Sequence, residues 1–161
     1  MIHSSKTRKE KGMIIKLDMS NAFDRVKHSF LYRVLEKFGF NTQFIMQIKA
    51  CIRHLWIAPL INKRPARFFQ ATWGIRKRCP LSPFLYILIV DSLSRKLQME
   101  MLAGNLLGIR TAHGFEPTNH TLFIDDSLFL GWASKNITRE FKRVLHSYCT
   151  ISGGKINYNK S

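Results

Sequence analysis

The stretch Thr121-Leu-Phe-Ile-Asp-Asp-Ser-Leu-Phe-Leu130 decides the fold, because two short apolar runs surround a pair of adjacent carboxylates. The runs 121–124 and 127–130 are typical of strands, and together they predict an antiparallel hairpin with the acidic pair at its tip. Two interpretations of Asp125 and Asp126 stay open here. Aspartate is common and solvated in tight hairpin turns, but two like charges near an apolar sheet surface also favour a bound divalent cation.

A second acidic position supports the metal interpretation. The apolar run Met13–Leu17 predicts a strand that ends at Asp18, where the strand gives way to a loop. If this strand lies beside the hairpin, Asp18 joins Asp125 and Asp126 in one cluster. Three carboxylates can hold two metal ions about 4 Å apart, one activating a hydroxyl nucleophile and one steadying a leaving pyrophosphate. No nucleophilic side chain is needed, because phosphoryl transfer depends mostly on positioning and charge neutralisation.

The rest of the chain alternates between helical and strand patterns. Apolar residues at helical spacing predict helices near 30–38, 42–54, 80–97 and 138–148. A hairpin is expected from Trp56–Ile61, a turn at Asn62-Lys63 and Arg67–Thr72, and a short strand from Lys155–Tyr158. This mixed order predicts an α+β fold, with helices layered against an antiparallel sheet.

Charge separates this chain from an ordinary globular protein. Its 161 residues are enough for one domain with a core, but 26 Lys and Arg residues against 10 Asp and Glu give a net charge of +16. Such an excess predicts a phosphate-rich partner, because neutralising phosphates releases condensed counterions. A generic basic surface is the plainer alternative.

The cysteines, the N-terminal residues and the apolar runs indicate the cellular compartment in which the protein works. Cys51, Cys79 and Cys149 are odd in number and far apart, which argues against a disulfide framework or a zinc site. The polar, basic residues Met1–Lys11 do not resemble a secretory signal, and the longest apolar run, Phe84–Val90, is too short to span a bilayer. We therefore expect an intracellular protein, cytoplasmic or nuclear, without membrane contact.

Four segments resemble successive motifs of LINE-type (non-LTR) retrotransposon reverse transcriptases, particularly those of plant elements. In order they are Lys16-Leu-Asp-Met-Ser-Asn-Ala-Phe-Asp24, Pro80-Leu-Ser-Pro-Phe-Leu-Tyr86, Phe123-Ile-Asp-Asp-Ser-Leu128 and Ser152-Gly-Gly-Lys-Ile-Asn-Tyr-Asn-Lys-Ser161. The resemblance implies the palm of a right-hand polymerase, with fingers and thumb largely missing. Residues 1–12 would be a basic N-terminal segment, and residues 13–161 a partial palm domain.

The resemblance also implies roles for individual positions. Asp18, Asp125 and Asp126 fall on the catalytic carboxylates, which hold two Mg²⁺ ions, with Mn²⁺ as a substitute. Phe23 falls on the bulky position that crowds a ribose 2′-hydroxyl, although a core aromatic is the alternative. Arg76, Lys77 and Lys155 fall on substrate-binding positions: Arg76 with its basic neighbours for template or phosphate contacts, and Lys155 near a lysine credited with protonating the leaving pyrophosphate. Asp24 matches as a structural acid, and Lys160 is a second candidate beside Lys155.

The implied partners are an RNA template, a DNA primer and a dNTP, together with the rest of a retroelement polyprotein, including its endonuclease. The chain departs from the family at Arg76-Lys77-Arg78-Cys79-Pro80, where Arg-Gln-Gly-Asp-Pro is usual. A glycine lets the backbone approach template and nucleotide closely, so Arg78 puts a side chain where little room is expected. Ile124 replaces the usual alanine before the acidic pair.

Three functions follow from these observations. The first is RNA-directed DNA polymerisation by two-metal nucleotidyl transfer in retrotransposition. The second is a catalytically inactive, nucleic-acid-binding remnant of a retroelement, favoured by the net charge and the altered 76–79 loop. The third, a mobile-intron maturase, would need an RNA-splicing domain that the sequence does not encode.

Overall fold

The computed structural model describes residues 11–53, 56–77, 79–110, 115–123 and 126–161. Within these residues the strands are β1 (Gly12–Asp18), β2 (Trp56–Ile57), β3 (Leu60–Ile61), β4 (Arg64–Pro65), β5 (Phe69–Gln70), β6 (His120–Phe123) and β7 (Asp126–Trp132). The helices are α2 (His28–Lys37), α3 (Thr42–Arg53), α4 (Leu81–Leu102) and α5 (Lys135–Ser152). Residues 1–10 lie outside the described part, so the domain boundary at residue 12 stays a prediction.

The central sheet has the order β1-β7-β6, and both pairings are antiparallel. Its register aligns Gly12 with Trp132 at one end and Asp18 with Asp126 at the other. The expected hairpin is therefore formed by β6 and β7, and the expected strand before Asp18 lies beside it. One detail differs from the sequence prediction: Asp126 is the first residue of β7, paired with Phe123, and does not belong to the turn.

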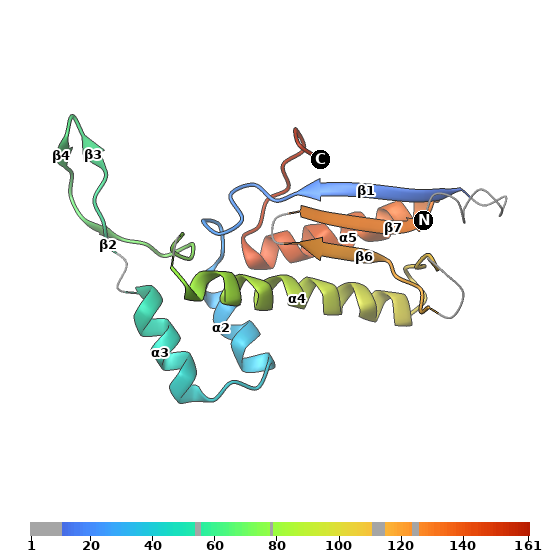
Figure 1. Cartoon of the computed structure of the whole chain (residues 1–161), viewed down its shortest axis with the longest axis horizontal. Helices are drawn as coiled ribbons and strands as arrows, with labels where there is room; N and C mark the ends of the chain where they lie inside the picture. Colours follow the sequence, from blue (N-terminus) through green and yellow to red (C-terminus); the bar gives the residue numbers. More distant parts are fainter. Residues whose placement is uncertain (1–10, 54–55, 78, 111–114, 124–125) are drawn as a thin grey trace.

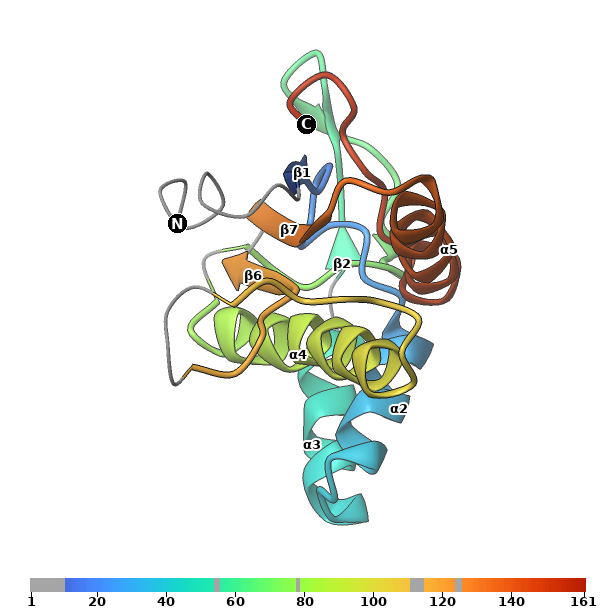
Figure 2. The same ribbon diagram turned by 90° about the vertical axis from the view of Figure 1, so that its right-hand side faces the viewer.

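Both long helices cover the same face of the sheet (Figures 1 and 2). Side chains of alternate strand residues point to that face, and they meet α4 and α5 in one core. Phe129 and Phe141 are each 1% exposed, and their rings meet edge to face with centroids 5.4 Å apart. The expected α+β layering is confirmed. The opposite face carries exposed residues such as Ile14 and Lys16, and it remains uncovered by the described helices.

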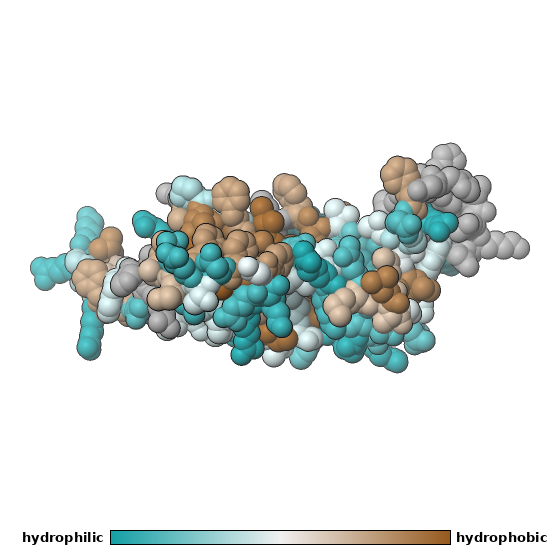
Figure 3. Space-filling model, turned by 90° about the horizontal axis from the view of Figure 1, so that it is seen from below, coloured by the Kyte–Doolittle hydropathy of each residue, from teal (hydrophilic) through white to brown (hydrophobic). Residues whose placement is uncertain are grey.

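A second core joins α2 and α3 to the first half of α4. Leu31 and Leu35 of α2 are completely buried, and Ile89 of α4 is 2% exposed. The first half of α4 is apolar on more than one side, so Phe84 and Ile87 stay exposed. Figure 3 shows the lower side of the molecule, where apolar side chains gather on the surface of the body and hydrophilic ones project from its left end.

Residues 56–70 form a projection that we call the arm (Figure 1). Its expected turn is present: Asn62 and Lys63 have φ values of 50° and 64°, as a type I′ turn requires. The strands are shorter than predicted, because the hairpin divides into the separate pairs β2–β5 and β3–β4. Pro59 lies in the gap between the two pairs, and proline lacks the N–H that a continuous ladder needs.

Polar contacts tie α4 to the surrounding elements. Glu100 of α4 is 6% exposed, and its carboxylate contacts Lys96 Nζ at 2.9 Å and Arg143 Nη2 of α5 at 3.0 Å. Asn105 Nδ2 donates to the same carboxylate at 2.7 Å. The hydrogen bonds from Lys96, Asn105 and Arg143 lower the pKa of Glu100 to about 2. The carboxylate is therefore ionised at neutral pH and helps to fix α4 against α5.

The C-terminal elements differ from the sequence prediction in length. Helix α5 begins at Lys135, after Ser134 with extended backbone, and ends at Ser152, which is followed by Gly153 in the left-handed conformation. It is therefore longer at both ends than the predicted 138–148. The strand expected over 155–158 is reduced to one antiparallel bridge between Ile156 and Met19. Among the described residues, no helix has the length and apolar character needed to cross a bilayer.

Candidate catalytic and metal site

Two of the predicted catalytic carboxylates lie directly opposite each other at one end of the sheet. Asp18 is the last residue of β1, Asp126 is the first residue of β7, and the two are Cα partners in the register. Directly opposed residues project to the same side of a sheet, and this side is the open one. Asp125 lies outside the described residues, so its expected place in the cluster stays a prediction.

A lysine supplies a positive charge beside this pair. Lys16 precedes Asp18 by two strand positions, so its side chain lies on the same face. Its Nζ is 3.3 Å from Asp126 Oδ1, with side chains that are 57% and 48% exposed. An ion pair so open to water adds little to stability. Its local effect is to offset part of the charge of two neighbouring carboxylates.

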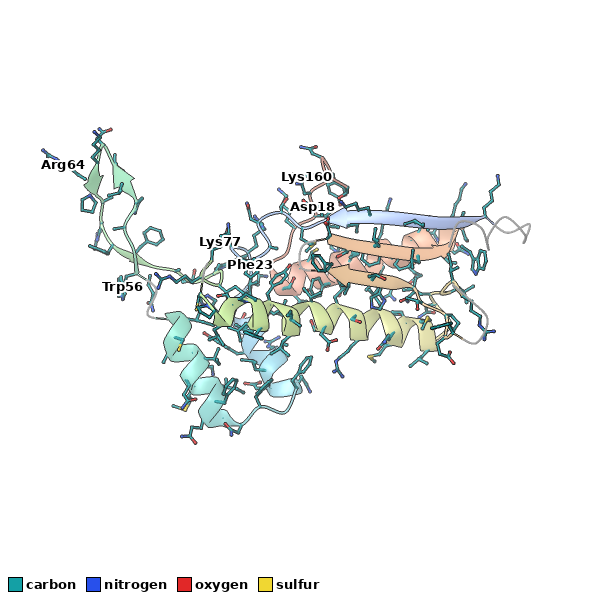
Figure 4. The ribbon with its side chains drawn as sticks, in the orientation of Figure 1. Asp18, Phe23, Trp56, Arg64, Lys77 and Lys160 are labelled. Carbon is teal, nitrogen blue, oxygen red and sulfur yellow. The ribbon has the colours of Figure 1, made fainter. Side chains whose placement is uncertain are left out.

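The C-terminal loop reaches the same point from the other side. Asn157 Nδ2 donates a hydrogen bond of 2.9 Å to Asp18 Oδ2, and the Asn157 backbone N–H donates to the Asp18 carbonyl at 2.9 Å. Figure 4 shows Lys160 on the C-terminal loop near Asp18 at the end of β1. Residues from three distant parts of the sequence thus meet at one end of the sheet.

Phe23 lies in the loop between β1 and α2. Its ring stacks on Tyr86 of α4 with a centroid distance of 4.7 Å and an interplanar angle of 26°. The Phe23 carbonyl accepts a hydrogen bond of 2.9 Å from Ile75 N–H, which joins this loop to the segment after the arm. Phe23 is half-buried and also contacts the second core. Its position is compatible with both interpretations, the nucleotide-facing aromatic and the core aromatic.

The basic loop 76–79 meets the same region. Lys77 Nζ pairs with Asp24 Oδ2 at 2.6 Å, while the structural role expected for Asp24 stays a prediction. Arg76 is exposed, and its carbonyl accepts a hydrogen bond of 2.7 Å from Ser82 Oγ in the first turn of α4. Figure 4 shows Lys77 beside Phe23, at the base of the arm. Arg76 and Lys77 therefore lie between the arm and the loop that carries Phe23.

Lys155 lies on a different side of the sheet. It lines a cavity of about 630 Å³ between β1, α5 and the C-terminal loop, together with Ile15 and Leu17. Leu17 precedes Asp18 by one strand position, so this cavity faces the helix-covered side, away from the open face. The structure brings Asp18, Asp126 and Lys16 together, but it places Lys155 on the other side of β1.

The two opposed carboxylates suit a hard divalent cation, because Mg²⁺ prefers oxygen ligands from one or two carboxylates together with substrate phosphates. The ammonium group of Lys16 beside Asp126 offsets part of this negative charge. Within the described residues, no three His, Cys, Asp or Glu side chains converge into a metal-binding group. Two carboxylates alone leave a hard cation with open coordination positions, which water or substrate oxygens can fill.

Comparison with known proteins establishes the family. Residues 2–161 match the family described as reverse transcriptase (RNA-dependent DNA polymerase), and the chain belongs to this family. Its members generally use divalent metal ions. The chain is 26% identical over 149 residues to the Pol polyprotein of the type-2 retrotransposable element R2DM of Drosophila melanogaster, covering 91% of this chain and 13% of the relative. It is 25% identical over 147 residues to a 149 kDa protein of transposon TX1 of Xenopus laevis, covering 91% of this chain and 11% of the relative.

A plant relative is shorter. An uncharacterized mitochondrial protein of Arabidopsis thaliana is 34% identical over 79 residues, covering 49% of this chain and 65% of the relative. The chain thus spans less than two thirds of each of these relatives. Telomerase from Candida albicans, solved with a fragment of telomeric RNA, shares the fold with a TM-score of 0.69 at 15% identity, covering 98% of this chain and 29% of the telomerase. Telomerase from Candida tropicalis gives a TM-score of 0.67 at 16% identity, covering 96% of this chain and 31% of the telomerase.

The non-LTR resemblance is confirmed by these relatives, and the palm-like fold is confirmed by the solved structures. Lys16 and Asn157 both lie within the quoted motifs, but no role was predicted for either residue. For Lys16 a signal was present, because a residue two positions before Asp18 on a strand must share its face. For Asn157 there was none, since its partner depends on how the C-terminal loop folds back.

Proposed function

We propose that this chain carries the nucleotidyl-transfer centre of an RNA-directed DNA polymerase that serves retrotransposition. The reaction would join a dNTP to the 3′-hydroxyl of a DNA primer on an RNA template. The observation that supports this most directly is the pairing of Asp18 with Asp126 at the open end of the sheet. The polymerase as a whole is longer than this segment, so its activity, substrates and partners are part of the proposal.

The proposed ligands for two Mg²⁺ ions, or Mn²⁺ in their place, are Asp18, Asp125 and Asp126. When bound, the ions would activate the primer hydroxyl and neutralise charge on the leaving pyrophosphate. Before substrate binds, the Lys16 ammonium would partly neutralise the negative charge of Asp126. Phe23, held against Tyr86, would limit the room beside the sugar and so favour dNTPs.

The basic groups would hold the nucleic acid and the phosphates. Arg76 and Lys77, at the base of the arm, would contact template or nucleotide phosphates. Lys155 stays a proposed phosphate contact, although its place on the helix-covered side favours Lys160 for any role beside Asp18. The fingers, thumb and endonuclease of a retroelement polyprotein would complete the enzyme. Because its substrates are RNA and dNTPs, we expect it to work in the cytoplasm or the nucleus.

A second function is supported by a separate observation. No Asp or Glu stands between Glu36 and Asp91, and the arm lies within this interval. The arm also exposes Trp56, Phe68 and Phe69, which are 58%, 62% and 52% exposed. Basic groups interleaved with exposed aromatics suit single-stranded nucleic acid, because every base can stack on an aromatic ring. A catalytically inactive remnant would retain this binding and lose only the chemistry.

The test is primer extension by a related non-LTR polymerase in which this segment replaces the corresponding one. With Mg²⁺ or Mn²⁺ we expect DNA synthesis on an RNA template, and a loss of at least about a thousandfold in Asp125→Asn, because the metal charges are central to the transition state. Asp91→Asn is the matched control, since the one ion pair that Asp91 makes with a described residue is with Arg95, on the same helix α4. RNA binding without extension by the unmutated chimera would support the inactive remnant instead.

A further inference from the structure

The C-terminal loop closes on Asp18 through three hydrogen bonds, and a fourth bond holds the loop itself in shape. Two come from Asn157, one from its backbone N–H to the Asp18 carbonyl and one from Nδ2 to Asp18 Oδ2, both 2.9 Å. The hydroxyl of Ser161 makes the other two: it accepts from Asp18 N–H at 3.2 Å and donates to the Asn157 carbonyl at 2.7 Å. Of these four bonds, the one from Asn157 Nδ2 reaches the Asp18 carboxylate. The other three join backbone groups to each other or to the Ser161 hydroxyl.

The loop is also anchored on both sides of this contact. Ser20 N–H donates to the Lys155 carbonyl at 2.8 Å, and Lys27 N–H donates to the Ser152 carbonyl at 2.8 Å. Gly154 lies against Met19 so closely that an added Cβ would come 2.7 Å from the Met19 side chain. With so many fixed points the loop has little freedom, so the Asn157 amide is presented to Asp18 from a defined direction.

We propose that Asn157 is a positioning residue that fixes the Asp18 carboxylate for a divalent cation, an inference that rests on the proposed function. The amide occupies Oδ2, while Oδ1 of Asp18 receives no hydrogen bond or ion pair from any residue that the structure describes. An amide brings a donor without a charge, so it orients the carboxylate without replacing the cation. Groups of this kind, behind a metal ligand, commonly set its orientation and metal affinity.

The two carboxylates are consequently held in different ways. Asp126 has the charged partner Lys16, whose exposed ammonium can be exchanged for a metal ion. Asp18 has the neutral partner Asn157, which is half-buried and can stay in place when a cation binds to Oδ1. Asp18 is therefore the pre-oriented ligand of the pair, and the C-terminal loop determines that orientation.

The test measures Mn²⁺ binding to the 161-residue chain by electron paramagnetic resonance, which needs no catalysis. Asn157→Ala should weaken Mn²⁺ affinity about tenfold, the usual size of effect for a group that orients a metal ligand. Asn159→Ala is the matched control, because Asn159 lies in the same turn and only its backbone N–H bonds to Asn157. Asp18→Asn defines the level of binding without the carboxylate.

Ser161→Ala separates orientation from general loosening of the loop. It removes both Ser161 hydroxyl contacts but leaves the amide on Asp18, so we expect affinity within about twofold of the unmutated chain. Equal losses in Ser161→Ala and Asn157→Ala, or no loss in Asn157→Ala while Asp18→Asn abolishes binding, would overturn the positioning role and leave the metal site standing. If Asp18→Asn binds Mn²⁺ as well as the unmutated chain, the proposed metal site fails, and the positioning role fails with it.

Discussion

The end of the sheet and the arm are built in opposite ways. At the sheet end, Asp18, Asp126 and Asn157 come from distant parts of the sequence and are joined by strand pairing and hydrogen bonds. In the arm, β3 pairs only with its neighbour β4, and aromatic rings face solvent within the described residues. The end of the sheet keeps a few polar groups in fixed positions, whereas the arm exposes a large, positively charged surface. Fixed geometry suits chemistry on one atom, and an open surface suits a flexible polymer.

The largest expected difference between the regions is in stability. Phe129→Ala should lower the unfolding free energy by about 3–5 kcal/mol, because the ring is buried between β7 and α5 and its removal leaves a cavity. Phe69→Ala in the arm should change it by less than about 0.5 kcal/mol, since the ring is 52% exposed. Urea unfolding of both variants measures the difference. A large loss in Phe69→Ala would mean that the arm packs on the body in solution.

The second difference concerns glycines with positive φ. Gly153 has φ +88°, and an added Cβ would overlap the Arg25 carbonyl oxygen, so Gly153→Ala should cost about 2–4 kcal/mol of unfolding free energy. Gly39, after α2, has φ +84° with nothing within 4 Å of an added Cβ. Gly39→Ala should therefore cost only the backbone strain, about 1 kcal/mol. Equal costs in thermal or urea unfolding would show that the C-terminal loop yields at Gly153.

Much of the fold followed from local patterns in the sequence. Helix α3 was predicted because Ile45, Ile48 and Ile52 recur at helical spacing, and all three are buried as expected. The strand before Asp18 was predicted from its apolar run, whereas its pairing with the hairpin was only a condition of the three-carboxylate site, and the structure supplies that pairing. These features depend on neighbours in sequence or on a single chemical requirement.

The features that were missed depend on tertiary contacts. The expected strand at 155–158 reduces to one bridge at Ile156, because the chain then turns so that Asn157 and Ser161 can bond to Asp18. The shift of Asp126 from turn to strand moves the strand boundary by one residue, and apolar patterning does not fix element boundaries that closely. The side of β1 on which Lys155 lies could not be predicted either, since no local pattern orients a loop residue.

The smallest expected effect tests whether the charge of the arm is used. Lys63, Arg64 and Arg67 are exposed and make no ion pair with any residue that the structure describes. Replacing all three by Gln should weaken binding of a single-stranded RNA 20-mer about tenfold near physiological salt, since fewer phosphates are neutralised.

The same replacement on α5 is the matched control. Lys135, Arg139 and Lys142 are also exposed and make no ion pair within the described residues, and helix α5, which carries them, packs on the sheet away from the arm (Figure 1). Fluorescence anisotropy over a range of salt concentrations separates the two sets. If the arm contacts the RNA, its variant lowers the slope of log affinity against log salt by about 2, while the α5 variant leaves the slope almost unchanged. Equal changes would mean that the net charge of +16 acts as a whole and that the arm has no special part in binding.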